Sequence, residues 1–347
     1  MPSVLDFIDN KNLNLSQTDY YAAILGESPS KGAKSPALWN AAFKGLGLAG
    51  IMHPMDVQPD RLADAVAHLR QDEQFIGGAV TMPYKIQIIP FLDVIEPEAE
   101  AIGAVNCIYR KDGRLIGTNT DGAGALWSLN QNMPGGIEGK SVLLLGTGGA
   151  GFAVAAYLAS ALGPQGQLHL LNRSSASRDQ LAQRLQGKCK IEIGEWPPKP
   201  HQIKPVDILI NCSSVGFETT KTDAKGAFNL RFFTPLGPLD DSIRVKTHEA
   251  AEKQYLMRAV GAIKKNFGHS LDVLAAADDL FVFDIIYQPQ QTVLLYLADM
   301  LGYKTLNGVS MNLEQAVIAF EKAAAAFGNE TAQKDSNRIR SYMRKVW

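Results

Sequence analysis

The chain has 347 residues, of which 46% are hydrophobic and 20% are charged, as in ordinary globular proteins. This length predicts two domains, each large enough to bury its own core. Lys and Arg number 34 against 35 for Asp and Glu, and no block of like charge runs along the chain. The sequence therefore shows no cluster of basic residues of the kind that binds nucleic acids or anionic membranes.

Cysteine usage and the N-terminal residues bear on the compartment. Cys107, Cys189 and Cys212 are widely spaced and form no CxxC pair, which predicts buried thiols in a reducing compartment, with neither a disulfide framework nor a metal site. The first residues carry acids and no apolar run, unlike a signal peptide, and no segment reaches the length of a membrane span. We expect a cytoplasmic protein.

Strands and helices are predicted to alternate over residues 20–125. Such alternation at these separations predicts βαβ units and a mostly parallel sheet. The expected strands are Tyr21–Leu25, Gly50–Pro54 and Gly77–Met82, and the expected helices are Ala37–Leu46 and Asp60–Arg70.

A second alternating pattern begins after Lys140. Its first strand is a continuous apolar run, as expected of a strand that is buried on both faces. Residues 216–284 show no clear periodicity, and the polar tail after Gly328 is expected to fray. The elements expected here are strands Ser141–Leu145, Gln167–Leu171 and Val206–Ile210 and helices Phe152–Leu162, 292–301 and 312–326.

A glycine-rich turn joins the first strand and helix of this second pattern. Gly146, Gly148 and Gly151 form a G-x-G-x-x-G sequence, in the strand–turn–helix context that a dinucleotide site requires. Glycines allow backbone N–H groups to approach a pyrophosphate at the positive end of the helix. A purely structural turn is the alternative, because the motif alone is not specific.

The end of the next strand indicates which dinucleotide is bound. An NAD site would place Asp or Glu about 20 residues after the fingerprint, against the ribose 2′-hydroxyl. This chain has Asn172, Arg173 and Ser174 there and no acid. A guanidinium beside a hydroxyl suits a 2′-phosphate, so NADP is favoured over NAD. The alternative is that Arg173 is an ordinary solvated surface residue.

Two polar segments precede the nucleotide half, each where a strand is expected to end. One is Val80-Thr81-Met82-Pro83-Tyr84-Lys85, and the other combines 104–106 (AVN) with 119–122 (NTDG). A lysine and an aspartate that met there would form a proton-transfer pair. Taken alone, a lysine at a strand end is more often a solvated charge.

These segments together resemble the shikimate and quinate dehydrogenase family. The resemblance runs in one order from about Tyr21 to about Phe320, and several short motifs in one order are far more specific than a glycine fingerprint. The motifs are VTMPYK (80–85), AVN (104–106), GTNTDGAGA (117–125), LLLGTGGAG (143–151), LNRS (171–174), NCSSVG (211–216), DIIYQP (284–289) and NGVSM (307–311), with Gln315.

The resemblance implies roles for individual residues. Lys85 and Asp121 would be the catalytic pair that handles the proton. Other polar side chains would hold the hydroxyls and carboxylate of a small cyclic acid: Ser35, Thr81, Asn106, Tyr287 and Gln315. The cofactor set would be Gly146, Gly148, Gly149, Ala150, Gly151, Asn172, Arg173, Ser174 and Ser213.

The resemblance also implies a fold of two α/β domains with a cleft between them. Residues 1–125, completed by about 305–347, would form the substrate domain. Residues 126–304 would form a doubly wound Rossmann domain for NADP, with an insertion near 217–283. The implied setting is aromatic amino acid biosynthesis, in a monomer or homodimer with no nucleic acid or membrane partner.

The chain departs from the family's pattern in two places. The loop Gly26–Pro36 is one residue longer than usual, lacks a histidine, and has Ala33 where the first of two carboxylate-binding serines is expected, whereas Ser35 is present. The stretch from Asn211 to Tyr287 is also longer than usual.

Three functions therefore stay open. The first is an NADP-dependent enzyme that interconverts shikimate and 3-dehydroshikimate. The second is a quinate or aminoshikimate dehydrogenase, which the altered loop favours. The third is a ligand-sensing protein that kept the fold and lost the chemistry, although such a protein would not need both Lys85 and Asp121.

Overall fold

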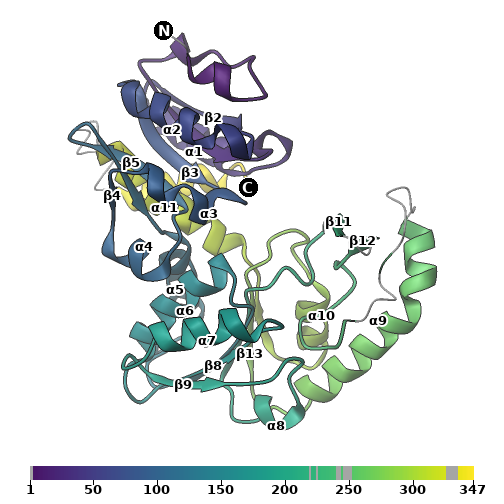
Figure 1. Ribbon diagram of the computed structural model, residues 1–347. Coiled ribbons are helices and arrows are strands. Elements are labelled where there is room, and N and C mark those ends of the chain that lie inside the picture. The colour runs from purple at the N-terminus through teal and green to yellow at the C-terminus, as the bar shows by residue number, and fades with distance from the viewer. Residues whose placement is uncertain (1–2, 219, 224–225, 240–243, 245–251, 326–334) are drawn as a thin grey trace. The chain divides into compact units, whose positions relative to one another are not determined.

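A computed structural model describes residues 3–218, 220–223, 226–239, 244, 252–325 and 335–347 (Figure 1). The chain forms two compact units. Unit 1 comprises Met1–Trp127 and Met311–Trp347, and unit 2 comprises Ser128–Ser310. Both are α/β, as predicted. Within the described residues, no helix combines the length and apolarity needed to cross a bilayer.

Unit 1 contains one six-stranded sheet in the order β2-β1-β3-β5-β6-β4. Strands β1, β2 and β3 are parallel, but β5 runs antiparallel to both β3 and β6. The prediction of a mostly parallel sheet is confirmed, since β4 also pairs in parallel with β6, and only β5, in a β5–β6 hairpin that was not predicted, runs the other way. The strands are β1 (Tyr20–Gly26), β2 (Gly50–Asp56), β3 (Phe75–Val80), β4 (Val94–Ile95), β5 (Cys107–Lys111) and β6 (Arg114–Thr118).

Helices cover both faces of this sheet, since alternate residues of β1 enter two separate cores. Ala22 and Ile24 pack with α1, α11 and α13, whereas Tyr21 and Leu25 pack with α2 and the start of the chain. The helices are α1 (Ser35–Leu46), α2 (Leu62–Gln71), α3 (Tyr84–Gln87), α4 (Pro97–Ile102), α5 (Asp121–Asn132), α11 (Val309–Ala325) and α13 (Ser336–Arg344), with single 3₁₀ turns at Val4–Phe7, Leu15–Gln17, Pro29–Lys31, Pro59–Arg61 and Ile89–Phe91.

The C-terminal tail corrects a prediction. Residues 328–334 lie outside the described part of the chain, but α13 is a helix where fraying was expected. Its few apolar side chains explain this, because Ile339 and Met343 are fully buried against the core of unit 1. A polar sequence with two apolar residues four positions apart gave little sign of that packing.

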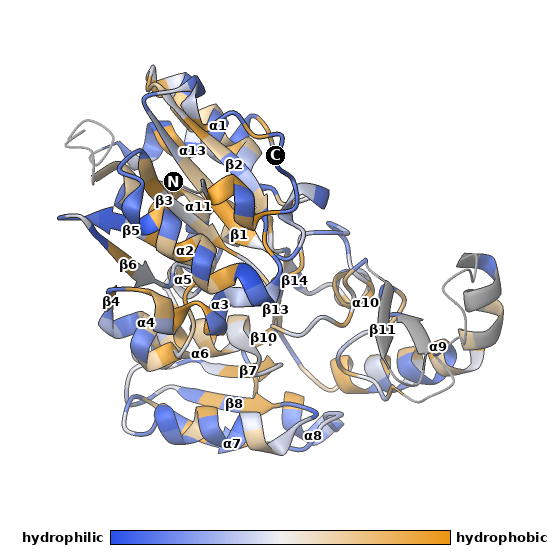
Figure 2. Cartoon of the chain, turned by 45° about the horizontal axis from the view of Figure 1, so that its top comes forward, coloured by the Kyte–Doolittle hydropathy of each residue, from blue (hydrophilic) through white to orange (hydrophobic). Residues whose placement is uncertain are grey.

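Unit 2 contains a six-stranded parallel sheet in the order β14-β13-β10-β7-β8-β9. The first strand of the unit, β7, lies in the middle, with β8 and β9 on one side and β10, β13 and β14 on the other. This is the doubly wound arrangement of a Rossmann fold, which confirms the predicted class. Its central strands consist mainly of hydrophobic residues (Figure 2), apart from Ser141 at the start of β7 and Asn211 at the end of β10. The strands are β7 (Ser141–Leu145), β8 (Gln167–Leu171), β9 (Lys190–Ile193), β10 (Ile208–Asn211), β13 (Phe281–Asp284) and β14 (Lys304–Leu306).

Helix α6 (Gly149–Leu162) follows β7, and α7 (Ser175–Arg184) follows β8. The short α8 (Pro200–Ile203) precedes β10, and α10 (Val293–Met300) precedes β14. Residues 305–310 belong to unit 2 and not to the returning segment, because β14 pairs with β13.

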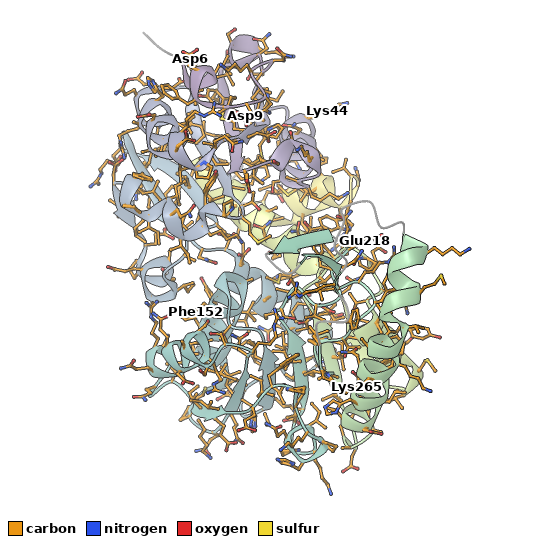
Figure 3. All side chains as sticks on the ribbon, turned by 45° about the vertical axis from the view of Figure 1, so that its right-hand side comes forward. Asp6, Asp9, Lys44, Phe152, Glu218 and Lys265 are labelled. Carbon is orange, nitrogen blue, oxygen red and sulfur yellow. The ribbon has the colours of Figure 1, made fainter. Side chains whose placement is uncertain are left out.

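The interval without clear periodicity contains a hairpin of β11 (Thr220–Asp223) and β12 (Gly226–Asn229) and the long helix α9 (Glu252–Leu274). Residues 219, 224–225, 240–243 and 245–251 of the predicted insertion lie outside the described residues. Helix α9 buries Asn266 and Ser270 and exposes the basic pair 264–265, of which Figure 3 labels Lys265. Polar residues on its buried face obscured the helical pattern.

All three cysteines are free thiols. Cys107 and Cys212 are buried, as predicted, but Cys189 is only half-buried because it lies in the turn before the edge strand β9.

Candidate active site

A lysine and an aspartate meet at the carboxyl end of the unit 1 sheet. The Lys85 Nζ lies 2.5 Å from the Asp121 Oδ2. Lys85 belongs to the short helix α3, which follows β3, and Asp121 is the first residue of α5, which follows β6. The buried Tyr84 anchors α3, since its hydroxyl donates to the Val57 carbonyl at 2.5 Å. The lysine side chain is 24% exposed and the aspartate side chain 11%, so the ammonium has an open side.

Asn106 fixes the other oxygen of this aspartate. Its Nδ2 donates to the Asp121 Oδ1 at 2.8 Å and to the Thr120 Oγ1 at 3.0 Å. Its Oδ1 accepts the Thr120 N–H at 2.7 Å, which fixes the orientation of the amide. The result is a line of contacts from Asn106 through Asp121 to Lys85, in which a backbone N–H holds the Asn106 amide.

The segment Ala104–Asn106 holds these elements together. The Val105 N–H donates to the Lys85 carbonyl at 2.7 Å, and the Asn106 N–H donates to the Thr118 carbonyl at 3.1 Å. The buried Asn119 donates from Nδ2 to the Ala104 carbonyl and accepts the Asp121 N–H on Oδ1. These bonds tie α3, β6 and the start of α5 to one short stretch of chain, so the lysine and the carboxylate are positioned before any ligand binds.

Two further residues predicted to bind substrate, Gln315 and Thr81, lie beside this cluster or its strands. The Gln315 Oε1 lies 3.4 Å from both Asn106 Nδ2 and Thr120 Oγ1. Thr81 directly follows β3, and its N–H donates to the Leu25 carbonyl at the end of β1. Among the described residues, its hydroxyl has no hydrogen-bond partner.

Ser35 is the first residue of α1 and is buried. Its hydroxyl likewise has no partner within the part of the chain that the structure describes. Tyr287 belongs to unit 2, is half-buried, and has its pKa raised by that burial. The structure therefore brings Lys85, Asp121, Asn106 and Gln315 together. Tyr287 belongs to unit 2, so its role in substrate binding stays a prediction.

The loop Gly26–Pro36, which departs from the family's pattern, is held in place by Ser30. Its N–H and its hydroxyl both donate to the buried carboxylate of Asp56, at 2.9 and 2.5 Å. Ser30 is therefore occupied and does not replace the missing serine. Ala33 packs its methyl group against the core that contains Leu38 and Trp39.

The glycine-rich turn of unit 2 needs glycine at two positions. Gly146 has φ +96°, and a Cβ there would lie 2.7 Å from the Ser213 nitrogen. A Cβ on Gly151 would lie 2.0 Å from the Gly146 carbonyl oxygen. By contrast, the space beside Gly148 and Gly149 is open, and no side chain caps the start of α6. An open, uncapped helix N-terminus after a buried strand fits a pyrophosphate, and Ala150 and Ser213 line the same turn.

The residues after β8 are tied to this turn. The Thr147 N–H donates to the Asn172 Oδ1 at 3.4 Å, and the Ser177 hydroxyl donates to the Thr147 carbonyl at 2.6 Å. Arg173 is exposed, and its Cζ lies 6.0 Å from the centroid of the Trp196 ring. Ser174 precedes α7, and its side chain does not cap that helix.

Sequence reasoning assigned no role to Asp284, at the end of β13. Its carboxylate is fully buried and accepts from Asn211 Nδ2, Thr292 Oγ1 and the Ile286 N–H. Burial raises its pKa from 3.8 to about 7, and the three hydrogen bonds oppose that rise. The signal in the sequence was an acid directly after three apolar strand residues. Asp284 joins β10, β13 and the start of α10, beside the segment that carries Tyr287.

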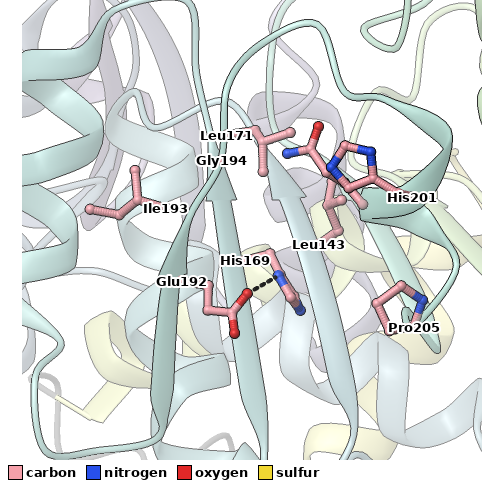
Figure 4. A pocket seen from close by; sticks show the side chains of 9 residues that line it. Leu143, His169, Leu171, Glu192, Ile193, Gly194, His201 and Pro205 are labelled. Atoms are coloured by element: carbon pink, nitrogen blue, oxygen red, sulfur yellow. Dashed lines mark ion pairs between the residues drawn. The ribbon is translucent and has the colours of Figure 1, made fainter.

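A cavity of about 220 Å³ in unit 2 is lined by residues of β7, β8, β9 and α8 (Figure 4). His169 pairs there with Glu192 at 3.2 Å through Nδ1, and its Nε2 contacts the Ser141 hydroxyl at 3.1 Å. Both ring nitrogens are thus engaged, and burial lowers the histidine pKa. The ion pair links the edge strand β9 to its neighbour β8. Among the residues described, no three His, Cys, Asp or Glu side chains gather as a metal site would need.

Comparison with known proteins gives consistent matches. A family model described as the shikimate dehydrogenase substrate binding domain matches residues 25–108. The shikimate dehydrogenase (NADP(+)) of Carboxydothermus hydrogenoformans is 34% identical over 295 residues, which cover 85% of this chain and 88% of that protein.

Solved structures also match. A shikimate dehydrogenase in complex with NADP+ aligns with a TM-score of 0.67 at 26% identity, covering 96% of this chain and 98% of that one. The ligand-free 5-ketofructose reductase of Gluconobacter sp. strain CHM43 aligns with a TM-score of 0.67 at 26% identity, covering 95% and 99%. These alignments extend over both units.

Proposed function

Because the chain belongs to the shikimate dehydrogenase family, we propose that it is an NADP-dependent oxidoreductase that interconverts shikimate and 3-dehydroshikimate. The expected setting is aromatic amino acid biosynthesis. A cytoplasmic location is part of this proposal, supported by three free thiols in a chain without paired cysteines.

The observation that carries the proposal is the contact between the Lys85 Nζ and the Asp121 Oδ2 at 2.5 Å, in a cluster otherwise closed by Asn106. A solvated surface lysine would not need a carboxylate that is itself held by the Asn106 amide. A ligand-sensing protein would not need a positioned proton donor either, so this cluster favours an enzyme.

The chain's own residues would handle the proton. NADPH, when bound, supplies the hydride to the carbonyl carbon, and NADP+ accepts it in the reverse direction. In the reductive direction, Lys85 gives one proton to the carbonyl oxygen as that oxygen gains negative charge. The C=O π bond breaks while one C–H and one O–H bond form. Asp121 keeps the ammonium in place, and Lys85 takes the proton back in the oxidative direction.

Substrate recognition would use the polar groups beside this pair. The hydroxyls of Ser35 and Thr81, which have no partner among the described residues, and the amides of Asn106 and Gln315 can bond to ring hydroxyls and a carboxylate. Tyr287 stays a predicted substrate residue of unit 2. Buried groups of this kind discriminate well, because a wrong ligand leaves them without a partner.

The cofactor would be held by the turn at Gly146–Gly151, whose uncapped helix start suits the pyrophosphate. Arg173 and Ser174 would bind the 2′-phosphate of NADP, since no acid stands at the end of β8 to bind the 2′-hydroxyl of NAD. NAD is therefore the less favoured cofactor.

A second candidate substrate is suggested by Ala33. Its methyl group cannot donate to a carboxylate, and Ser30 is held by Asp56 instead of replacing the missing hydroxyl. A ketose without a carboxylate would not need that contact, whereas quinate and aminoshikimate carry a carboxylate as shikimate does and would need another group to bind it. The structural match to a 5-ketofructose reductase makes the last of these worth testing.

Steady-state turnover with NADP+ and NAD+ against shikimate, quinate and aminoshikimate, and with NADPH against 5-ketofructose, tests the proposal. We expect kcat/KM to be highest for shikimate with NADP+. A higher value for another compound would reassign the substrate and leave the proton pair intact. The absence of turnover with every compound would instead favour a ligand-sensing protein.

A further inference from the structure

Trp196 lies next to the arginine that the proposed function assigns to the 2′-phosphate. Strands β8 and β9 are parallel neighbours, so the residues after their carboxyl ends come together at one edge of the sheet. Arg173 follows β8 and Trp196 follows β9. The Arg173 Cζ lies 6.0 Å from the centroid of the indole ring, within the range of a cation–π contact.

Arg173 has no ion pair among the described residues, and its side chain is exposed. The nearby Arg178 is already engaged, because it donates to the Gly194 carbonyl at 2.7 Å and pairs with Asp179 at 2.9 Å. The indole face is therefore the contact that restricts the Arg173 guanidinium. A long, exposed arginine without such a contact would lose more rotamer freedom on binding an anion.

The indole itself is fixed. Its Nε1 donates to the Pro235 carbonyl at 2.7 Å, and its ring packs against the core of unit 2. Because one edge of the ring is bonded and the rest is half-buried, the ring presents a constant face to Arg173.

Helix α9 holds the segment that fixes the indole. The fully buried Asn266 accepts the Thr234 N–H at 2.9 Å and donates to the Thr234 carbonyl at 3.1 Å. The Ser270 and Thr234 hydroxyls are 2.6 Å apart. His269 of the same helix contacts the Pro198 carbonyl at 2.8 Å, two residues after the tryptophan. Helix α9 thus contacts the chain close to both partners of the hydrogen bond between Trp196 and Pro235.

We propose that Trp196 is a positioning residue that sets the preference for NADP over NAD, by holding the Arg173 guanidinium ready for the 2′-phosphate. In this arrangement Thr234, Pro235 and helix α9 support the cofactor site through the tryptophan. The proposal rests on the proposed function, because it takes Arg173 as the residue that binds the 2′-phosphate.

The test is the dissociation constant of NADP+ and of NAD+, measured by titration calorimetry on the full-length chain for Trp196→Leu, Trp196→Phe, Arg173→Ala and the Arg173→Ala/Trp196→Leu double variant. We expect Trp196→Leu to weaken NADP+ about three- to ten-fold and to leave NAD+ within about two-fold. Trp196→Phe keeps an aromatic face and should retain most of the NADP+ affinity. In the Arg173→Ala background, Trp196→Leu should have no further effect on NADP+.

Equal weakening of both cofactors by Trp196→Leu, or the same loss of NADP+ affinity in the Arg173→Ala background, would overturn the proposal and make Trp196 a core residue only. Should Trp196→Leu fail to fold, Trp196→Met carries the same comparison, since it fills much of the space without a π face. The proposed cofactor site fails separately if Arg173→Ala alone leaves the preference for NADP+ unchanged.

Discussion

Lys85 is the residue whose removal tests the proton transfer most directly. In Lys85→Ala we expect turnover to fall by roughly 10²–10⁴-fold, the range for losing a positioned acid or base. The dissociation constant of NADP+ should barely change, since the residues proposed to bind it belong to unit 2. Steady-state kinetics and calorimetric titration measure the two effects, with the exposed Lys111→Ala as the control. Retention of more than about a tenth of the turnover would refute the assignment.

Asp284 predicts a dependence of stability on pH. Its pKa is about 7 in the folded chain and near 3.8 when unfolded, so between these values the folded state holds a proton that the unfolded state releases. The free energy of unfolding therefore falls as pH rises from about 4 to about 7, by at most about 1.4 kcal/mol per pH unit, and levels off above that. Asp284→Asn should remove this contribution, because an amide does not titrate in this range, while its oxygen can still accept the hydrogen bond from the Thr292 hydroxyl.

Urea denaturation of both proteins at several values between pH 4.5 and 8 gives the comparison. The signature is a smaller loss of stability with pH in Asp284→Asn than in the unchanged chain. Parallel curves for the two proteins would mean that Asp284 does not titrate in this range.

The candidate residues differ in how visible they are in the sequence. Lys85, Asp121 and Asn106 stand at strand ends, where a parallel sheet collects site residues, but their roles were predicted from the motifs that resemble the family. Trp196 was not singled out, and Asp284 was named only as part of the motif 284–289 with no role, for a physical reason. Their importance depends on which strand lies beside β8 or β10, and neighbours in a sheet are set by topology and not by local spacing.

At the scale of elements, α13 is held by a buried ion pair. Arg340 donates from Nε and Nη2 to the two carboxylate oxygens of Glu314 on α11, at 2.7 and 2.8 Å. The Arg340 Cζ also lies 4.7 Å from the centroid of the Trp127 ring. The Glu314 side chain is 5% exposed, so its charge depends on this one arginine for compensation.

Arg340→Ala should therefore destabilise unit 1 by about 3–5 kcal/mol, the usual cost of leaving a buried charge unpaired. Arg338→Ala on the same helix is the matched control. That side chain is 52% exposed and pairs with Asp335 at 3.6 Å, so its loss should cost about 0–1 kcal/mol. Denaturant unfolding measures both, and similar losses in the two variants would show that the Glu314 pair is not what holds α13.

Regular elements were the easiest part of the fold to predict. The apolar runs that became β7 and β8 have the predicted bounds, since strands buried on both faces have little choice of residue. The β5–β6 hairpin was missed because its strands are short and half polar. Helix α9 was missed because Asn266 and Ser270 occupy its buried face, where a pattern search expects apolar residues.

At the scale of the whole molecule, each unit has separate cores, and the proposed cofactor residues all lie in unit 2. Binding of NADP+ should therefore stabilise unit 2 more than unit 1. At a free concentration of 100 times the dissociation constant, the gain is about 2.7 kcal/mol. Hydrogen exchange of the full chain should show amides of β7, β8 and β10 slowed by up to about 100-fold, and amides of β1 and β3 slowed less. Equal slowing in both sheets would show that the units unfold together.

The path of the chain through the two units has a consequence for synthesis. The core of unit 1 that contains Trp39 and Phe43 is closed by α11 and α13, which follow the whole of unit 2 in the sequence. At about 5–20 residues per second, a ribosome spends roughly ten to forty seconds on the intervening residues. During that time one face of the first sheet has left the ribosome covered by α1 but without α11 and α13. Unit 2 is thus complete before unit 1, and the nascent chain passes through a stage in which chaperones have an apolar surface to bind.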